Sequence, residues 1–540
     1  MAQRNKRNKN KKSGLADSVL GTAEWVLMAF SVTLVFIVFV MQAYTIPTGS
    51  MASSLKGAHF KLRCSQCGYL YDYGFDHQRY NLSPNVTPGG DNVVIEPLRT
   101  GRGNRVQRTL PPRCPSCGYF MAPVKLSYGR PVVPPERVGP VTKGDRIFVL
   151  KCIYQFIEPS RWDVVVFKNP VEPAINYIKR MIALPGETVE IVDGDIYIDG
   201  KMARKPENVQ EEMWMSVYDN DYHPVEPEIA RYNGHTWVQP FVNTEGSQWD
   251  LTENSGRLFK LESSPDNIHT IYYDTSKGND FRASYAYNNP RSYKFMPVCS
   301  DLMAQFQVQA GQGDAVLGAE LTKYGIRYRG RVNSDGTMVI SRIDAEDTIT
   351  ELAAGQGKWV QGDEAKRFRF MNVDHRLVLE FGDSQIEYDL GRDRDDAGTI
   401  IKVMPEAKIF GAGELTLSHV GLFRDMHYTQ VTQNGDHILR AGAGDPFTLS
   451  DDQYFVCGDN SPASFDSRLW DQPGLGNSGR EYREGVVPRE YLVGKAFFVY
   501  WPGGYQPKIG NKGFGPRLVP NTRGMKAIYG GRYQTDTATD

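Results

Sequence analysis

An uncharged run of 17 residues, positions 25–41, constrains this chain more than any other feature of its sequence. As a helix the run is about 26 Å long, and Ala23 and Ala43 extend it towards the ~30 Å hydrocarbon core of a membrane. The alternative is a cleaved export signal, but the triplet before the cut would begin with the large Met41 where a small residue is wanted. We therefore expect residues 21–44 to be an uncleaved transmembrane anchor.

The charge distribution orients this anchor. Residues 1–20 carry six lysines and arginines against one acidic residue, Asp17. Because basic segments beside a membrane span stay in the cytoplasm, we expect a cytoplasmic N-terminus, a single crossing of the cytoplasmic (inner) membrane, and an extracytoplasmic position for everything after Tyr44. The whole chain has 62 basic and 63 acidic residues, a balance that excludes a nucleic-acid binder driven by overall basicity.

Three short segments carry residues suited to catalysis. The first, positions 46–51, reads Ile-Pro-Thr-Gly-Ser-Met and places Ser50 directly after the anchor. The second is a predicted strand, positions 176–182, in which Lys179 stands beside apolar residues that would solvate an ammonium group poorly. The third, positions 458–468, reads GDNSPASFDSR.

Together with the basic and apolar N-terminus, these segments resemble type I signal peptidases, the membrane-bound serine proteases that remove export signals from translocated proteins. The third segment fits the family pattern G-D-N-x-x-x-S-x-D-S-R at every fixed position. The resemblance covers residues 45–55, 143–204 and 448–501 as a catalytic core. It implies a mainly β, signal-peptidase-like fold and a serine endopeptidase that needs no cofactor for catalysis.

By this resemblance the catalytic pair consists of Ser50 as nucleophile and Lys179 as general base. A serine hydroxyl is a weak nucleophile until a base takes its proton, and a lysine with the ordinary pKa near 10.4 is protonated at neutral pH. Burial disfavours the ammonium form, so we expect the pKa of Lys179 to be lowered by about three units.

The resemblance also assigns supporting roles near this pair. Ser464 would hydrogen-bond the Lys179 amine and hold it towards the nucleophile. Gly458 would let its loop approach closely, because glycine has no Cβ. Asp466 and Arg468 would form the ion pair that fixes this loop.

The resemblance further implies an oxyanion hole made by the Ser50 N–H and the Thr48 hydroxyl. The substrate would bind as an extended strand, with pockets that admit only small side chains at the first and third positions before the cut. The expected partners are the signal peptides of translocated preproteins, with membrane lipid and the export machinery as neighbours and no nucleic acid.

Residues 56–142 form a first insertion with two C-x-x-C-G motifs, whose cysteines are Cys64, Cys67, Cys114 and Cys117. Each tight turn brings two sulfurs towards one metal, so the two motifs together predict a zinc-ribbon-like site with a structural zinc ion. Disulfides between the same cysteines are the alternative, because an oxidising exterior favours them.

A second insertion, residues 205–447, is long enough to be a domain. Apolar and polar residues alternate in short segments separated by turns, as in Phe306, Val308 and Ala310 with glutamines between them. This pattern predicts a β-sandwich, with a jelly roll as one of its forms. Residues 502–540 are expected to form a C-terminal tail.

The sequence therefore predicts a membrane-anchored endopeptidase that cleaves signal peptides from exported proteins. The alternative is a catalytically silent, membrane-anchored envelope-binding protein that uses the β-sandwich and zinc-ribbon modules. The presence of Ser50, Lys179 and Ser464 in this order favours the enzyme, because a binding protein has no physical need for a buried lysine.

Overall fold

The computed structural model describes residues 2–83, 86–88, 92–100, 106–107, 110–128, 130–229, 231, 234–288, 293, 295–359, 362, 364–477, 479–503, 508–509, 512–513 and 522–531. Of the predicted C-terminal tail, positions 504–507, 510–511, 514–521 and 532–540 lie outside these described residues. The structure is mainly β, which confirms the predicted fold class.

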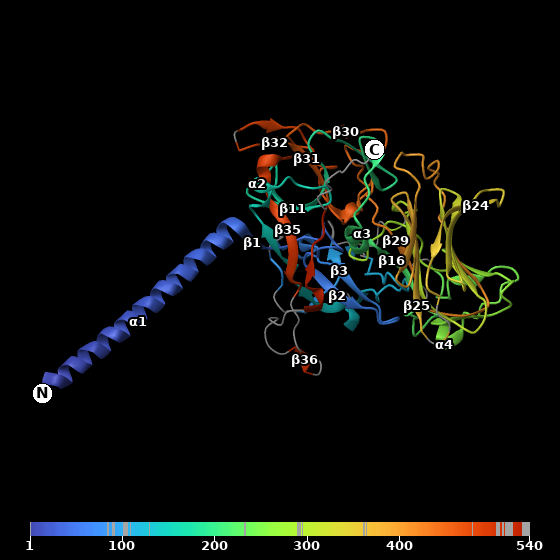
Figure 1. Ribbon diagram of the computed structural model, residues 1–540, viewed down its shortest axis with the longest axis horizontal. Helices are drawn as coiled ribbons and strands as arrows, with labels where there is room; N and C mark the ends of the chain where they lie inside the picture. The colour runs from blue at the N-terminus through green and yellow to red at the C-terminus, as the bar shows by residue number, and fades with distance from the viewer. Residues whose placement is uncertain are drawn as a thin grey trace.

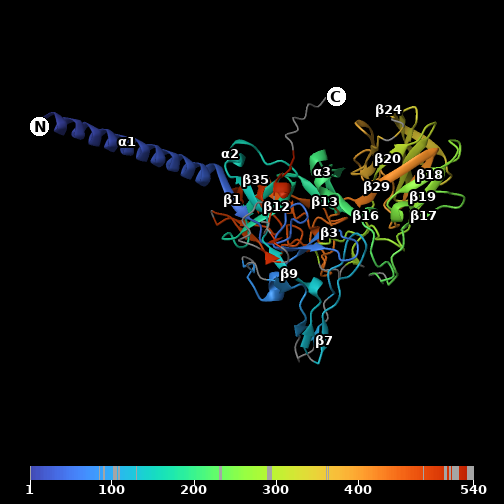
Figure 2. The same ribbon diagram turned by 90° about the horizontal axis from the view of Figure 1, so that it is seen from below.

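Helix α1 (Ala2–Val35) projects as a rod from a β-rich body, and both views show it clear of the body along its length (Figures 1 and 2). A π-helix, Phe36–Val40, follows, and strand β1 (Met41–Thr45) then enters the body. The helical region thus ends at Val40, whereas the predicted anchor extends to Tyr44. Among the described residues, no helix has both the length and the apolar character that crossing a membrane requires.

Segments far apart in the chain meet in one antiparallel sheet, called the catalytic sheet after the predicted role of Lys179. Its order is β1, β10, β35, β11, β12, β31, β34, with β38 paired to β35. The bounds after β1 are β10 (Arg146–Leu150), β11 (Val164–Lys168), β12 (Asn176–Ala183), β31 (Gln453–Cys457), β34 (Val487–Pro488), β35 (Leu492–Trp501) and β38 (Lys526–Ala527). Strand β11 lies inside the sheet because its apolar residues, mostly β-branched, are buried from Val164 to Phe167.

Smaller elements accompany the catalytic sheet. One group is a sheet of β13 (Thr188–Val192), β14 (Asp195–Ile198), β15 (Lys201–Met202) and β30 (Phe447–Thr448). The remaining elements are separate: helix α2 (Ile153–Phe156), the pair of β32 (Gly474–Leu475) with β33 (Glu481–Tyr482), and the pair of β36 (Lys508–Ile509) with β37 (Lys512–Gly513).

The first insertion is built on a sheet in the order β3, β2, β9, β4. Its strands are β2 (His59–Arg63), β3 (Leu70–Gly74), β4 (Asn92–Val94) and β9 (Val138–Thr142), with the pairs β5 (Arg99–Thr100) and β6 (Val106–Gln107), and β7 (Lys125–Ser127) and β8 (Arg130–Val132). The β7 hairpin extends outward from the body (Figure 2).

The second insertion contains two antiparallel sheets that share one apolar core, a β-sandwich. One sheet holds β16 (Met215–Asp219), β18 (Phe259–Glu262), β20 (Leu302–Ala310), β25 (Lys366–Val373), β26 (Arg376–Phe381), β27 (Ser384–Asp389) and β29 (Glu414–Arg424). The other holds β17 (Phe241–Asn243), β19 (His269–Tyr273), β21 (Val316–Lys323), β22 (Ile326–Asn333), β23 (Thr337–Ile343), β24 (Ile349–Gln356) and β28 (Ala407–Ala412). Helices α3 (Glu207–Met213) and α4 (Glu253–Gly256) accompany them.

The alternation seen in the sequence sets the faces of the sandwich strands. In β20, Phe306, Val308 and Ala310 are buried, whereas Gln307 and Gln309 are exposed. The Phe306 ring stacks on Phe368 of the adjacent strand β25, with centroids 4.6 Å apart. The sandwich lies on the side of the body away from α1 (Figure 1).

Candidate active site

Strand β12 carries Lys179 into the interior of the catalytic sheet. The strand starts exposed at Asn176 and is buried from Lys179 to Ala183. Lys179 lies opposite Val165 of β11, which is itself fully buried. Because its neighbours in the sheet are apolar, the lysine has little access to water and is only 4% exposed.

Ser50 lies in a loop, residues 46–55, that follows β1 and is called the nucleophile loop after the predicted role of Ser50. The Ala52 N–H donates to the Gly49 carbonyl at 3.1 Å, and the Leu55 N–H donates to the Met51 carbonyl at 2.8 Å. Met51 and Leu55 are buried, so they anchor the loop through apolar contacts and leave Ser50 half-buried beside the sheet.

The two predicted catalytic side chains meet. The Lys179 Nζ lies 2.8 Å from the Ser50 Oγ and 3.0 Å from the Ile178 carbonyl oxygen. Burial lowers the pKa of Lys179 to about 8, against the opposing influence of Asp466, Cys457 and Asp459. Within the described part of the chain, no carboxylate forms an ion pair with this amine. The arrangement therefore places a lysine ammonium that loses its proton more readily than usual within hydrogen-bonding distance of a serine hydroxyl.

The predicted close approach at Gly458 is present. A Cβ built on this glycine would lie 2.3 Å from the Ser464 Oγ and 2.4 Å from the Ser50 carbonyl oxygen. The next residues continue the contact, because the Asn460 N–H donates to the Ser50 carbonyl at 3.0 Å. A side chain at position 458 would push the nucleophile loop away from Ser464.

Asp466 and Arg468 form the predicted ion pair, with Nη2 2.8 Å from Oδ2 and Nε 2.9 Å from Oδ1. Burial alone would raise the pKa of Asp466, but the Arg468 guanidinium holds it below its ordinary value. The Asp466 carboxylate also accepts the Gly458 N–H at 2.9 Å. The pair thus fixes the loop that touches Ser50.

A second buried ion pair was not predicted from the sequence. Arg180, the neighbour of Lys179, donates to both carboxylate oxygens of Asp459 at 2.8 and 2.7 Å. Both residues are almost fully buried. Asp459 belongs to the GDN motif, and this position could have suggested that its carboxylate has a structural partner.

One expected contact, from Ser464 to Lys179, is not formed. The Ser464 side chain is buried, but its Oγ makes no hydrogen bond to Lys179, whose amine is directed at Ser50 and Ile178 instead. The Thr48 side chain is exposed. Its backbone lies against Gly57, where a Cβ would be 2.3 Å from the Thr48 carbonyl carbon.

The four predicted metal ligands do come together. One sulfur from each of Cys64, Cys67, Cys114 and Cys117 lies within 4.8 Å of the others, and the cysteines are not joined in disulfides. Sulfur separations of 3.7 Å (Cys64 to Cys117) and 3.6 Å (Cys67 to Cys114) are near the ~3.8 Å expected of tetrahedral ligands with 2.3 Å bonds to zinc.

Each cysteine motif folds as the same tight turn. The Gly68 N–H donates to the Cys64 carbonyl at 3.0 Å, and the Gly118 N–H donates to the Cys114 carbonyl at 3.1 Å. Both glycines have a positive φ, 78° and 70°, which explains why glycine follows each C-x-x-C. These turns aim all four sulfurs at one point.

A further group of buried ionisable residues, the junction cluster, lies between the small β13–β15 sheet and the sandwich. Its members are Lys205, Lys323, Asp195, Asp301, Asp374 and Asp425. Lys205 contacts Asp374 at 2.5 Å and Asp425 at 2.8 Å, and Lys323 contacts Asp301. The two lysines neutralise part of the negative charge of the four aspartates. The sequence analysis did not identify this cluster.

Comparison with known proteins points to one family. The family model described as "Signal peptidase, peptidase S26" matches residues 139–240 and 418–501, which include Lys179 and the 458–468 segment but not Ser50. Signal peptidase I of Bacillus licheniformis is 36% identical over 93 residues, 16% of this chain and 50% of the relative. Signal peptidase I T of Bacillus subtilis is also 36% identical over 93 residues, 16% of this chain and 48% of the relative.

The chain thus spans half or less of the length of these curated relatives. Among solved structures, sheep galectin-11 in complex with glycerol is 11% identical and covers 24% of this chain and 92% of its own, with a TM-score of 0.19. A likeness this weak says nothing about what the sandwich does.

Proposed function

The chain is related to the type I signal peptidases, and from this premise we propose that it is an endopeptidase that cleaves signal peptides from exported proteins. Ser50 is the nucleophile and Lys179 is the general base. The observation that carries the proposal is the 2.8 Å separation of the Lys179 Nζ and the Ser50 Oγ in a buried site.

The lowered pKa of the lysine supports its role as a base. With a pKa of about 8, roughly a tenth of the Lys179 amines are neutral at pH 7, whereas at the ordinary pKa fewer than about one in a thousand would be. The neutral amine takes the Ser50 proton as the Oγ attacks the scissile carbonyl carbon, and the resulting ammonium protonates the leaving amine. The acyl-enzyme is then hydrolysed by water, with Lys179 again as the base.

We assign the oxyanion hole to the Ser50 N–H and the Thr48 hydroxyl, and a structural role to Ser464 beside Gly458. The substrate is an extended segment with small residues at the first and third positions before the cut, because such a strand fits a shallow site beside a sheet. Asp466 and Arg468 hold the site together rather than react.

The test is cleavage of a preprotein in detergent by the wild type, Ser50→Ala and Lys179→Ala. We expect both variants to lose about 10³-fold or more of the activity while keeping the thermal unfolding midpoint near that of the wild type. Ser53→Ala, an exposed serine of the same loop as Ser50 that is not part of the proposed pair, is the control. Substantial activity in Lys179→Ala would remove the proposed base and favour the silent binding protein.

We also propose that the four cysteines hold a structural zinc ion. The closed set of four thiolates leaves no position for a substrate, and the sulfur separations are too long for disulfide bonds. Elemental analysis should give one zinc per chain, and Cys114→Ser should lose the metal and unfold at a lower temperature. Stoichiometric disulfides in place of zinc would contradict this assignment.

We further propose that the apolar run at positions 25–41 holds the protein at a membrane with the basic N-terminus in the cytoplasm. The side chains of α1 support this proposal, because Trp25, Leu27 and Val32 are all more than 60% exposed although they are apolar. Replacement of Leu27 and Val32 by arginine should release the protein from sedimented membranes, whereas arginine at the exposed Val225, in the loop between β16 and β17, should not.

A further inference from the structure

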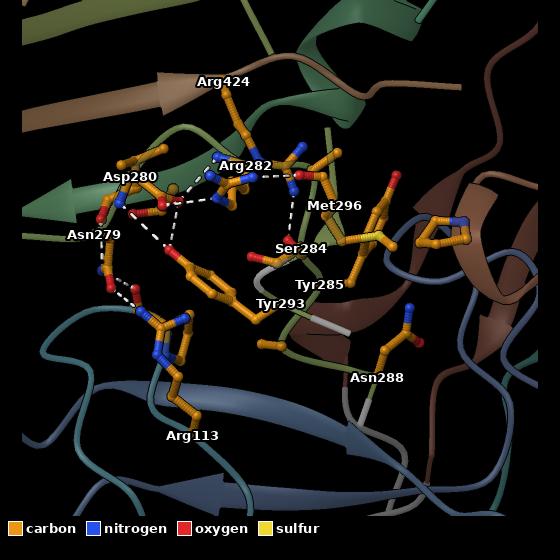
Figure 3. Close-up of a pocket in the computed structure, with 16 residues that line it drawn as sticks. Arg113, Asn279, Asp280, Arg282, Ser284, Tyr285, Asn288, Tyr293, Met296 and Arg424 are labelled. Atoms are coloured by element: carbon orange, nitrogen blue, oxygen red, sulfur yellow. Dashed lines mark hydrogen bonds and ion pairs between the residues drawn. The ribbon is translucent and has the colours of Figure 1, made fainter. Parts of the chain in front are cut away.

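The second insertion sends one segment towards the nucleophile. This segment, residues 279–288, is called the strap. Figure 3 shows Asn279 at one end of the strap, next to Arg113, and Asn288 at the other. The strap borders a cavity of about 60 Å³ that is also lined by residues of the first insertion and by Pro462 of the GDN loop. The strap, which is part of the second insertion, therefore lies beside both the first insertion and the GDN loop, residues 458–468.

The first end of the strap is fixed at the second cysteine turn. The Asn279 Nδ2 lies 2.6 Å from the Pro115 carbonyl oxygen and 2.8 Å from that of Ser116, both between Cys114 and Cys117. The Arg113 guanidinium donates to the Asn279 Oδ1. Because the side chain is buried, these contacts replace water for an amide that would otherwise be unsatisfied.

The second end of the strap reaches the loop beside Ser50. Asn288 and Asn460 exchange two amide hydrogen bonds, at 2.7 Å and 2.8 Å. Asn460 also donates its Nδ2 to the Gly49 carbonyl at 2.9 Å and its backbone N–H to the Ser50 carbonyl at 3.0 Å. Asn460 is 1% exposed, so without Asn288 one amide donor and one acceptor would lack partners in a buried place.

Two tyrosines of the strap support the same backbone. The Tyr287 ring fills the space over Gly49, where a Cβ would lie 2.1 Å from the ring, and its hydroxyl donates to the Ala58 carbonyl at 3.0 Å. The Tyr285 hydroxyl donates to the Asp459 carbonyl at 3.2 Å. The nucleophile loop and the GDN segment beside it are thus also held by residues of the insertion.

We propose that Asn288 is a positioning residue for Ser50 that acts through Asn460, so that the second insertion is part of the active-site scaffold. The inference rests on the proposed function, in which the Ser50 Oγ must stay within hydrogen-bonding distance of the Lys179 amine. Asn288 touches neither the substrate nor the reacting atoms. Its removal lets Asn460 and the Ser50 carbonyl shift, and small displacements of a nucleophile are costly.

The first test is kinetic. Asn288→Ala should lower kcat by about 10- to 100-fold while KM and the pH midpoint of activity stay close to those of the wild type. The same substitution in an Asn460→Ala background should cause little additional loss, because the pair is already broken. Asn220→Ala is the control: this amide of the insertion is buried, whereas Asn288 is half-buried, and it bonds to Arg257 and Val420 rather than to residues beside Ser50.

The second test does not depend on cleavage. Hydrogen exchange of the full chain should become faster at residues 46–55 in Asn288→Ala and stay unchanged there in Asn220→Ala. Wild-type kcat together with wild-type exchange in Asn288→Ala would overturn the inference. If the wild type and Ser50→Ala cleaved a preprotein equally, the proposed function would fail, whereas the exchange result would still decide whether Asn288 holds the loop.

Discussion

The candidate active site and the junction cluster both contain buried lysines, but their surroundings shift the lysine pKa in opposite directions. Lys179, Lys205 and Lys323 are 4%, 6% and 0% exposed, so burial does not distinguish them. Burial lowers the pKa of Lys179 to about 8. Burial also acts to lower the pKa of Lys205 and Lys323, but nearby aspartates reverse the effect and raise both values.

The difference lies in how the neighbouring carboxylates are used. In the junction cluster, Asp374 and Asp425 bind Lys205 directly. Near Lys179, the two closest aspartates are each already paired with an arginine, Asp459 with Arg180 and Asp466 with Arg468. An arginine keeps its proton at any physiological pH, so it holds its carboxylate permanently. The arginines thereby leave the lysine without a counterion, which is the condition for a base.

The largest effect that follows concerns Lys179→Met. We expect activity to fall by about 10²- to 10⁴-fold, because the general base is lost. The free energy of unfolding at pH 7 should not fall and should rise by up to about 3 kcal/mol, because the variant no longer buries an unpaired ammonium. Preprotein cleavage and chemical denaturation measure the two quantities. A large loss of stability would mean that the Lys179 charge is paired after all.

Lys205→Met should give the reverse result. Its removal leaves Asp374 and Asp425 buried without their cation, so we expect the free energy of unfolding to fall by about 3–5 kcal/mol. Activity per folded molecule should stay at the wild-type level, because the cluster contacts neither Ser50 nor Lys179. The two methionine variants serve as controls for each other. Equal losses of activity in both would show that the junction cluster is coupled to catalysis.

The proximity of Ser50 and Lys179 could be expected from the family resemblance, and the apolar setting of the lysine and the strand pattern from local sequence. Ile178 and Met181 beside Lys179 already indicate an apolar setting, and alternation in β20 sets its buried face. The identity of Arg180 and Asp459 as a buried pair could not be predicted, since 279 positions separate them and charged residues usually face water. The catalytic roles of Ser50 and Lys179 stay predictions until they are tested.

The strap and the orientation of Ser464 escaped the sequence analysis for other physical reasons. Asn279 and Asn288 lie outside any periodic segment, and their partners are set by how three parts of the chain pack. A serine hydroxyl can rotate between several partners, so the family pattern fixed the position of Ser464 but not its hydrogen bond. The glycines were more informative: Gly68, Gly118 and Gly458 each mark a place where a side chain does not fit or a positive φ is required.

The dependence of stability on alkaline pH should distinguish Lys179 from Lys205 further. The pKa of Lys179 is about 8 in the folded protein and 10.5 in the unfolded chain. Between these two pH values the unfolded chain binds more protons than the folded protein, so the free energy of unfolding rises with pH, by about 3 kcal/mol in total. The contribution of Lys205, whose folded pKa is raised, is complete below 10.5 and is lost as the pH rises further. Unfolding of the wild type and of both methionine variants between pH 7.5 and 10.5 measures the rise that Lys179 causes, which Lys179→Met should lack and Lys205→Met should keep, because the Lys205 contribution is constant over this range. In the wild type, kcat/KM should rise with pH and level off above about 8.

The smallest effect concerns the aromatic ring beside the catalytic amine. The Lys179 Nζ lies 5.4 Å from the centroid of the Tyr177 ring, which favours the ammonium form by about 0.5–1 kcal/mol. Tyr177→Leu should therefore lower the pKa of Lys179 and move the midpoint of the activity profile by about half a unit towards acid. Tyr177→Phe keeps the ring and should leave the midpoint unchanged. A midpoint that moves equally in both variants would attribute the effect to the hydroxyl, and a move towards alkali in Tyr177→Leu would mean that burial, not the ring, dominates at this position.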